Sequence, residues 1–579
     1  MTRVRVLPAG RNAVIVEGAD KETLNRLWRL LRYGAHSGVE DVIVGARTVG
    51  VIVSPGSDPH AVIQAALGRM RLGETTDSGF TGRLAKDRVP QPGGSQTGGS
   101  QTGESQPDGS RSESAAPRTV TIPVDYDGPD LEPTAADLGM PPAEIARRHS
   151  ASTWTVDFLG FSPGFAYLSG GDPALWVPRL SSPRLSVPAG SVAIAAGMTA
   201  VYPQPTPGGW RIIGSTQLSL FDAREENPSL LQPGDRVLFR ASVLSGGTGS
   251  TLRRTTSSRA PASSRPGMGV SSPATGDARA AGPSTLASGY VKVLDAGAGS
   301  TVQDCGRRGY GHLGVPRAGA ADASSAAQAN ALVGNPATSA LIESLVAPAT
   351  PGLVLRLGAP RTVAVSGARS EVTVDGIPAR QDVPLHLGAG AELRLGRGLS
   401  GLRVYVAVAG GIDVEPVLGS RSTDTLSGLG PSPLQPGDVL ALGAPGESTH
   451  AGPAFPKPAF PTPGEVICLG VTPGPRYDWL DRSGRETLKG TPFEVSSAAD
   501  RTGVRLAGPP VTLTEDAQLP SEALVAGAVE VAGGGSAIVM LRNHPTTGGY
   551  PVVAVVDDPD VDLLAQCAPG VRIRFDFHR

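Results

Sequence analysis

The stretch from Phe158 to Gly214 limits what this 579-residue chain can fold into more than any other part of it. Gly or Pro occurs every few residues, yet the stretch also holds two of the five Trp and several Phe and Tyr. A flexible linker with so much Gly and Pro would lack these aromatic residues, and a helix would lack the Gly and Pro. The stretch therefore predicts compact β-structure with many tight turns. A second stretch of this character, Gln303 to Gly319, opens the second half, so we expect two such units fused in one chain.

Length and charge narrow the class of protein. A chain of this length is too long to fold around a single hydrophobic core, and its length suggests about three to five domains. The net charge of -2 offers no basic field for nucleic acid. The three Cys lie far apart and form no metal or redox motif, as expected in a reducing cytosol. No apolar run reaches membrane-spanning length and no signal-peptide core is evident, so we expect a cytoplasmic protein that binds neither nucleic acid nor membrane.

Hydrophobic periodicity and composition divide the chain into six segments. Residues 1–72 contain an amphipathic helical pattern at Lys21–Arg32 between short apolar runs, which predicts a small α+β domain of the ferredoxin-like kind. Residues 73–117 and 241–288 lack periodicity and predict disordered linkers. The predicted β-rich modules are 118–240, 289–445 and 446–579.

The pentapeptide LQPGD closes two of these modules, at Leu231–Asp235 and Leu434–Asp438, each time before an apolar strand. Pro569 and Gly570 precede the last predicted strand in the same way. Pro followed by Gly specifies a type II turn wherever it occurs, so the turn alone is a generic signal. Three modules that end in such a turn and a strand suggest a repeated, barrel-type architecture, and leave internal duplication open.

Two common kinds of site have no motif here. No Gly-Lys dipeptide occurs, which excludes a Walker A nucleotide site. The eight His and three Cys show no H-x-H, H-E-x-x-H or C-x-x-C spacing, which argues against a structural zinc site. Any chemistry then depends on dispersed residues that folding brings together.

Long runs of the sequence resemble a pair of protein families. FLGFSPGFAYL, PRLSVPAGSVAIA and YPQPTPGGWRIIG are similar to allophanate hydrolase subunit 1-like proteins, also called the B component of 5-oxoprolinase or the Kip-inhibitor family. TVQDCGRRGYGHLGVPRAGAAD, AVAGGIDVEPVLGSRSTDTL, DRTGVRL and TTGGYP resemble the partner, the subunit 2-like family or C component of 5-oxoprolinase. The resemblance covers nearly all of the chain outside the two predicted linkers. The same pair of domains resembles the carboxyltransferase part of urea carboxylase.

The resemblance implies a mainly β fold with α+β parts, in which cyclophilin-like β-barrel modules follow the small N-terminal domain. It also implies the fused B and C components of an ATP-dependent 5-oxoprolinase, an ATP-hydrolysing lactam hydrolase that phosphorylates 5-oxoproline for ring opening to L-glutamate. ATP with Mg²⁺ is the implied nucleotide. The separate A component of 5-oxoprolinase, of the LamB/YcsF family, is the implied partner, and a homodimer is compatible with the resemblance.

Phosphorylation of a lactam oxygen needs groups that hold a carboxylate, a triphosphate and Mg²⁺. Arg suits the anions, acidic side chains suit the metal, and Gly admits close backbone contacts. With the resemblance, this makes the candidate catalytic residues His149, Asp304, Arg307, Glu343 and Glu522. The candidate substrate- or nucleotide-binding residues are Arg184, Ser191, Gly208, Gly209, Trp210, Gln303, Asp322, Asn330, Arg421, Ser422, Arg501, Arg505, Thr546, Thr547, Gly548, Gly549 and Tyr550. The metal ligands stay open.

Several of these candidates have a structural alternative. His149 suits capping or packing as well as acid–base chemistry. Pro207–Trp210 forms either a ligand-facing loop or a tight hairpin closed by a buried Trp. Asp304 and Arg307 could be only a local pair. Asn335 follows the predicted helix Ala323–Val333 and is expected to cap it.

Two short segments depart from the family pattern. Ala196–Ala200 stands where relatives typically have GGQTG, so that Met198 occupies a polar Gln position. Asn543–Pro545 stands where a D-x-Q run typically precedes TTGGYP, so that Asn543 replaces an acidic residue. If these positions touch nucleotide or metal, activity is weakened or altered. If they only shape turns, little changes.

Two other functions stay open on the sequence. One branch of the family inhibits a sensor kinase, so the chain could be a regulatory binding protein. An allophanate or urea-amide hydrolase or carboxyltransferase component is the other. No biotin-attachment or biotin carboxylase segment is evident in the chain, so this last role would need other proteins.

Overall fold

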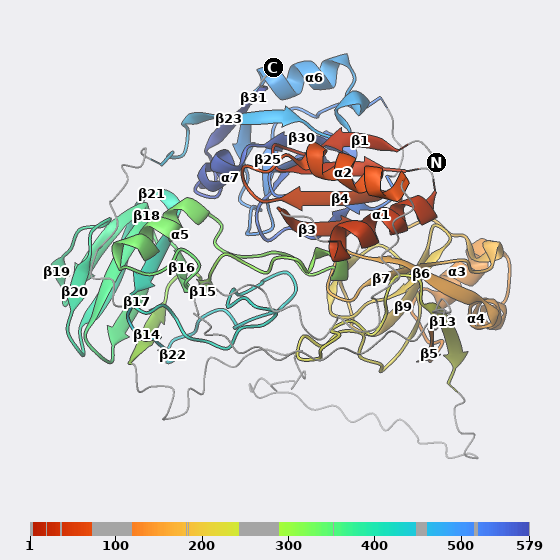
Figure 1. Cartoon of the computed structure of the whole chain (residues 1–579), viewed down its shortest axis with the longest axis horizontal. Helices are drawn as coiled ribbons and strands as arrows, with labels where there is room; N and C mark the ends of the chain where they lie inside the picture. The colour runs from red at the N-terminus through yellow and green to blue at the C-terminus, as the bar shows by residue number, and fades with distance from the viewer. Residues whose placement is uncertain are drawn as a thin grey trace, which may run out of the picture.

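The computed structural model arranges the chain in four folded parts, which Figure 1 colours from red at the N-terminus to blue at the C-terminus. It describes residues 4–18, 20–34, 38–71, 118–180, 182, 184–242, 289–350, 352–446, 460–514 and 519–577. The predicted linker 73–117 lies outside these residues, and so does the predicted linker 241–288 except for Ala241, which ends a strand, and Ser242. None of the helices in the described ranges has both the length and the apolar character needed to cross a membrane.

Residues 4–71 form a four-stranded antiparallel sheet covered by two helices. The strands β1 (Arg5–Pro8), β2 (Ala13–Glu17), β3 (Val39–Val44) and β4 (Thr48–Val53) lie in the order β1-β2-β4-β3, and the helices are α1 (Lys21–Tyr33) and α2 (Pro59–Arg71). The apolar face predicted for α1 is buried, and Asp20 caps its first turn by accepting a hydrogen bond from Thr23 N. The domain is a two-layer α+β unit as expected. Its element order is ββαββα, because a hairpin begins the chain, whereas a ferredoxin-like unit runs βαββαβ.

Residues 118–242 form a seven-stranded sheet that closes on itself. Its strands are β5 (Thr119–Val124), β6 (Thr153–Leu159), β7 (Ala166–Ser169), β9 (Ser191–Ala195), β10 (Met198–Val201), β12 (Arg211–Ser215) and β13 (Arg236–Ala241). The short strands β8 (Arg184–Val187) and β11 (Thr206–Gly208) pair separately, the helices α3 (Leu131–Leu138) and α4 (Pro142–Ala151) connect β5 to β6, and η2 (Pro173–Leu175) is a 3₁₀ turn. A bridge between Asp125 and Ser215 ties the edge strands β5 and β12 together.

Residues 289–446 form a nine-stranded sheet, drawn in green to turquoise in Figure 1. Its strands are β14 (Tyr290–Ala296), β15 (Ser300–Gln303), β16 (Leu341–Leu345), β17 (Leu353–Leu357), β18 (Arg361–Val374), β19 (Ile377–Pro378), β20 (Leu385–Leu387), β21 (Glu392–Val408) and β22 (Val439–Ala441). The helix α5 (Ala323–Leu332) packs on the long strands β18 and β21, and η3 (Gly311–Leu313) is a 3₁₀ turn. Asp322 caps α5 by accepting a hydrogen bond from Ser325 N.

Residues 460–577 form a closed seven-stranded barrel. Its strands are β23 (Val466–Pro473), β24 (Phe493–Val495), β25 (Gly503–Ala507), β27 (Ala528–Val531), β28 (Ala537–Met540), β30 (Val552–Val556) and β31 (Arg572–Phe577). The remaining elements are the paired short strands β26 (Glu522–Ala523) and β29 (Thr547–Gly548), the helices α6 (Arg482–Gly490) and α7 (Asp558–Leu564), and the 3₁₀ turns η4 (Tyr477–Trp479) and η5 (Gly533–Gly535).

The barrels at 118–242 and 460–577 share one strand order. The first runs β5-β13-β6-β7-β10-β9-β12, and the second runs β23-β31-β24-β25-β28-β27-β30. In each barrel the first and last strands pair in parallel. The Pro-Gly turns behave as predicted, because Gly234, Gly437 and Gly570 all have positive φ, at 93°, 97° and 90°. The first and last barrels therefore repeat not only the Pro-Gly turn but also the strand order.

The N-terminal sheet packs against the last barrel, so that the red strands lie against the blue ones in Figure 1. Leu7 of β1 and Ile15 of β2 belong to one buried apolar cluster with Leu524, Ala528 and Val555. Burial of this apolar surface stabilises the contact. The N-terminal domain, which belongs to the B-like half, therefore packs directly against the C-like half.

The stretch 303–319 also joins the two halves. Asp41 of β3 accepts hydrogen bonds from Gly309 N and Gly311 N, and Glu40 forms an ion pair of 2.6 Å with Arg308. Burial raises the pKa of the Asp41 carboxyl group to about 6. In the barrel at 118–242, Gly164 N donates to Leu313 O at 2.9 Å.

Candidate functional site

The predicted loop Thr546–Tyr550 lies where three domains meet. Its strand β29 pairs with β26, which places Thr547 opposite Ala523 and Gly548 opposite Glu522. Thr547 Oγ1 accepts a hydrogen bond of 2.8 Å from Phe161 N, in the turn after β6. The N-terminal domain reaches the same place, because its residue 46 donates from N to residue 521 O at 2.7 Å. We name residues 160–161, 521–523 and 546–550, with the side chains around them, the central junction.

Glycine makes this close approach possible. A Cβ added to Gly160 would lie 2.6 Å from Thr547 Oγ1. A Cβ added to Gly548 would lie 2.5 Å from Glu530 Oε1. Neither distance is available to a real side chain unless Thr547 or Glu530 moves, so glycine at both positions permits the packing seen here.

Three acidic side chains lie at the central junction together with Arg476. Arg476 Nη2 binds Glu522 Oε2 at 2.7 Å and Glu17 Oε1 at 2.9 Å. Because Glu17 comes from β2 and Arg476 precedes η4, these ion pairs join the N-terminal domain to the last barrel. Glu530 comes from β27 and lies beside Gly548. Within the described residues, Glu522 Oε1 and Glu530 Oε1 are both buried without a hydrogen-bond partner.

Glu530 differs from Glu522 in its protonation. Its side chain lies on a fully buried strand, and burial, together with the negative charge of Glu522, raises the pKa of its carboxyl group to about 8. Burial also raises the pKa of Glu522, and the bound guanidinium of Arg476 opposes that shift. A carboxyl group that titrates near neutral pH can give or take a proton during a reaction. Glu530 therefore has the properties of an acid–base group, whereas the predicted catalytic residue Glu522 is held in an ion pair.

Arg179 faces the same loop from the barrel at 118–242. It is half-buried, and within the described ranges its guanidinium forms no hydrogen bond or ion pair. Its Nη1 lies 3.5 Å from the position that a Cβ on Gly549 would occupy. Burial raises the pKa of the phenols of Tyr167 and Tyr202, and the positive charge of Arg179 lowers both. Tyr167 in turn lies 3.4 Å from Ser521, between their hydroxyl oxygens.

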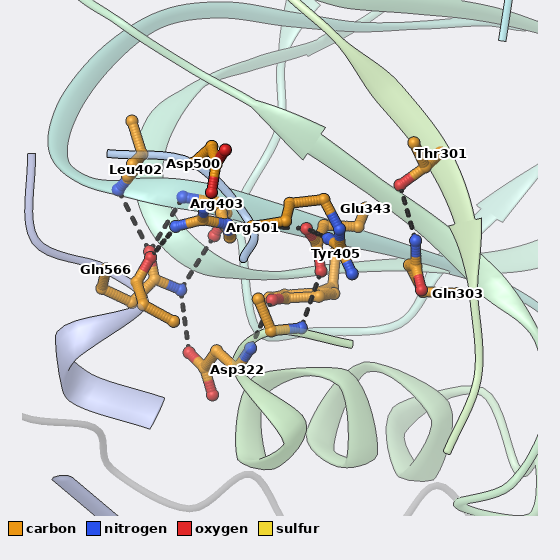
Figure 2. Close-up of polar contacts among 12 residues, drawn as sticks. Thr301, Gln303, Asp322, Glu343, Leu402, Arg403, Tyr405, Asp500, Arg501 and Gln566 are labelled. Carbon is orange, nitrogen blue, oxygen red and sulfur yellow. Dashed lines mark hydrogen bonds and ion pairs between the residues drawn. The ribbon is translucent and has the colours of Figure 1, made fainter. Parts of the chain in front are cut away.

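Three predicted residues lie together at a second place, between the nine-stranded sheet and the last barrel (Figure 2). Glu343 of β16 is buried between Arg501, which binds its Oε1 through Nη1, and Arg403, whose Nε lies 3.5 Å away. Its Oε2 accepts a hydrogen bond from Ala321 N at 2.9 Å. Asp322 accepts one of 2.8 Å from Gln566 Nε2. Because the charges of this group pair with one another across two domains, the contacts hold the domains together.

A third set of candidates, Gln303, Asp304 and Arg307, lies at and just after the end of β15 and holds the loop at residues 420–423 in place. Asp304 Oδ1 accepts hydrogen bonds from the Oγ atoms of Ser420 and Ser422, and its Oδ2 accepts one of 2.6 Å from Arg421 N. Arg307 is buried and donates to Ser422 O, and the Gln303 side chain donates to residue 423 O at 3.0 Å. The predicted residues are thus brought together, in contacts that fix the shape of the loop.

His149 is fully buried on α4. Its Nδ1 lies 2.8 Å from Tyr126 Oη and its Nε2 lies 2.8 Å from Thr199 Oγ1. Its ring packs on Phe239 with 4.4 Å between centroids, and burial lowers its pKa to about 3. This environment is the one expected for the packing alternative.

The other candidates of this barrel surround a tight hairpin. Arg184 of β8 forms an ion pair of 2.6 Å with Asp130 and lies opposite Gly208 of β11. Trp210 is buried against Tyr167 with 5.7 Å between ring centroids, as the hairpin alternative predicts. Ser191 begins β9 and is buried, and the carbonyl of Gly209 accepts a hydrogen bond of 2.8 Å from residue 180 N.

Three further candidates lie apart from one another. Asn330 is buried at the end of α5, donates to residue 339 O at 2.9 Å and accepts a hydrogen bond from Asn335. Asn335 also bonds residues 408 and 410, so it ties the helix end to β21, as a capping residue would. Arg505 is exposed on β25, and Tyr550 is 46% exposed at the central junction.

The two departures from the family pattern have different surroundings. Ala196 and Gly197 form the β9–β10 turn with φ of 50° and 76°, and Met198 packs at the edge of an apolar core. Asn543 is fully buried, and its Nδ2 donates to Asp424 Oδ1 at 2.8 Å. The first departure therefore shapes a turn, whereas the second supplies a hydrogen-bond donor to a buried carboxylate.

The run Gly160–Gly164 has the G-x-S-x-G pattern of a nucleophile elbow but lacks its structure. An elbow joins a strand to a helix, whereas this turn joins β6 to β7. Ser162 Oγ is buried, with no hydrogen-bond partner in the described ranges. The turn instead supplies Phe161 N to the central junction.

Four charged residues of the central junction were not found from the sequence: Glu17, Arg179, Arg476 and Glu530. A signal existed for Glu530, because it is a single acidic residue in the apolar strand Ala528–Val531. Arg179 stands five residues before the predicted Arg184 in a similar Pro-Arg-Leu-Ser run. Nothing in the local sequence indicates Glu17 or Arg476, which meet only through the packing of two domains.

Two family models match the chain. "Carboxyltransferase domain, subdomain C and D" matches residues 99–231, and "Carboxyltransferase domain, subdomain A and B" matches residues 313–577. The C subunit of 5-oxoprolinase from Escherichia coli K12 is 35% identical over 288 residues, which are 49% of this chain and 90% of that protein. The chain belongs to this carboxyltransferase-domain family.

Two further similarities extend beyond this part of the chain. The B subunit of 5-oxoprolinase from Escherichia coli O157:H7 is 49% identical over 133 residues, which are 22% of this chain and 61% of that protein. The crystal structure of TTHA0988 is 32% identical, covers the whole of both chains and has a TM-score of 0.75. Within the family, this chain thus combines a part similar to the B component with a part similar to the C component.

Proposed function

We propose that the chain is the fused B and C components of an ATP-dependent 5-oxoprolinase. In this role it phosphorylates 5-oxoproline, and a separate A component completes ring opening to L-glutamate. The observation that carries the proposal is the central junction, where Phe161 of the B-like part binds Thr547 of the C-like part. The similarity of the two parts to two proteins that share the name 5-oxoprolinase supports a joint site.

The central junction offers a proton acceptor for lactam activation. When the lactam oxygen attacks the γ-phosphorus of ATP, an O–P bond forms, the bond to ADP breaks, and the lactam nitrogen must lose its proton. Glu530 takes this proton on its buried Oε1. It must be ionised to do so, so the rate rises with pH toward the pKa of about 8. Glu522 helps to keep that pKa high through its negative charge.

The nucleotide brings its metal to the site as MgATP. Among the described residues, no group of three or more His, Cys, Asp or Glu is placed to hold a metal ion. Mg²⁺ is usually held by one or two carboxylates together with phosphate oxygens and water. In this proposal Mg²⁺ arrives on the triphosphate, as part of the substrate.

The test is the release of glutamate and ADP from 5-oxoproline and ATP by the full chain, with and without the A component. We expect turnover only with the A component, and a rate about 10²–10⁴-fold lower in Glu530→Gln. Glu494→Gln is the matched control, because Glu494 is exposed on β24 of the same barrel. Absence of turnover with every A component tried would contradict the proposal. Turnover of allophanate instead would assign the chain to urea-amide hydrolysis, and kinase binding without ATP hydrolysis would assign it a regulatory role.

A further inference from the structure

We propose that Arg179 and the turn at Gly548–Gly549 form a binding site for an anionic oxygen group, a carboxylate or a phosphate. The site is built from both halves of the chain. The identity of the anion rests on the proposed function, whereas the site itself follows from the residues around it.

The charge of Arg179 lacks a counter-charge in the described part of the protein. Half-buried guanidinium groups are stabilised by ion pairs, since partial burial weakens their contact with water. Arg476, at the same junction, is bound by Glu17 and Glu522. Arg179 forms no such contact with any described residue. A ligand anion would supply the missing partner.

Gly549 puts no side chain into the space beside the guanidinium of Arg179. A Cβ on Gly549 would lie 3.5 Å from Arg179 Nη1, at van der Waals contact, so any larger side chain would extend into this space. The planar guanidinium can donate two parallel N–H groups to one carboxylate or phosphate. The glycines also allow an anion to approach the backbone of the loop closely.

Neutral hydroxyl groups lie near Arg179, and a second guanidinium, that of Arg184, acts on the same phenol of Tyr202 as Arg179 does. Burial raises the pKa of Tyr167, which keeps its phenol protonated and able to donate. Thr547 and Ser521 bring hydroxyl groups to the same phenol. Arg184 Nη1 is buried and has no hydrogen-bond partner in the described part of the chain, although Nη2 of the same side chain binds Asp130. These groups favour a negative ligand over a positive one.

The experiment measures binding to the full chain by calorimetry, without the A component, so that it does not depend on turnover. The probes are inorganic phosphate, 5-oxoproline and 2-pyrrolidinone, which is the same lactam ring without the carboxylate. We expect Arg179→Gln to bind one of the two anions roughly tenfold to hundredfold more weakly. Arg236→Gln, an exposed Arg on β13, is the matched control and should bind like the wild type.

The outcomes separate the two sources of the anion. Loss of 5-oxoproline binding with unchanged 2-pyrrolidinone binding assigns the site to a carboxylate, and loss of phosphate binding assigns it to a phosphate. Equal affinities in Arg179→Gln and Arg236→Gln, or no binding of either anion to the wild type at millimolar concentration, overturn the proposal. Protection of Arg179 from phenylglyoxal by the same anions, followed by peptide mass spectrometry, gives a readout on the unmutated chain. A lack of protection there also overturns it.

Discussion

Replacing Glu530 by Gln tests whether this carboxyl group is protonated in the folded protein near neutral pH. The substitution keeps the size and shape of the side chain and removes its ionisation. It also keeps an acceptor oxygen for the backbone N–H of Tyr550, which interacts with Glu530 in the wild type. Any difference in pH dependence between the two proteins then reports on the carboxyl group.

The expected effect follows from the pKa of Glu530 in the two states. The unfolded chain releases this proton near pH 4.5, whereas the folded chain holds it up to about pH 8. Between these values the folded state binds more protons, so the free energy of unfolding falls as pH rises. At 1.36 kcal/mol per pKa unit, the wild type should lose about 5 kcal/mol relative to Glu530→Gln across this window. Below pH 4.5 and above pH 8 the difference should stay constant.

The assay is denaturant unfolding of both variants at a series of pH values from 4.5 to 9. Infrared spectroscopy at pH 7 should also show a protonated carboxylic acid in the wild type and in Glu494→Gln, but not in Glu530→Gln. A parallel pH dependence of unfolding in wild type and Glu530→Gln would refute the reasoning, and so would the absence of the infrared signal. Either result would mean that water or a counter-charge stabilises the ionised form.

Two further substitutions test the packing of the central junction. Gly160→Ala should destabilise the chain by about 1–3 kcal/mol, because its Cβ would overlap Thr547. The control Gly68→Ala should not destabilise it, because a Cβ there meets no atom within 4 Å. Equal unfolding midpoints for these two variants would contradict the close approach of Gly160 to Thr547. Arg476→Met should cost about 3–5 kcal/mol by leaving Glu522 buried and unpaired. Adding Glu522→Gln should recover most of this loss in denaturant unfolding, and a purely additive double variant would contradict the ion-pair explanation.

Local patterns predicted the parts of the fold that depend on neighbours in sequence. The amphipathic spacing in Lys21–Arg32 predicted α1, and Pro followed by Gly predicted the turn at Gly234. The order of the strands could not be predicted in this way. It depends on pairings such as β5 with β13, which join residues more than a hundred positions apart.

The candidate site was predicted unevenly for the same reason. Thr546–Tyr550 was found because TTGGYP resembles a run of the subunit 2-like family, and it lies at the central junction. His149 was selected on its chemistry, but its burial and its partners are set by α4 packing on β13. Arg476 was missed because its role comes from Glu17, which is brought to it by the docking of the N-terminal domain.

The contact between Phe161 and Thr547 joins residues 386 positions apart within one molecule. Its formation is therefore a unimolecular event, for which a tether can supply an effective concentration on the order of millimolar. Dilution does not separate such partners, whereas two free chains dissociate once their concentration falls below their dissociation constant. The catalytic unit proposed for this chain would thus stay assembled at any cellular abundance, and its two halves would always be present in equal amounts.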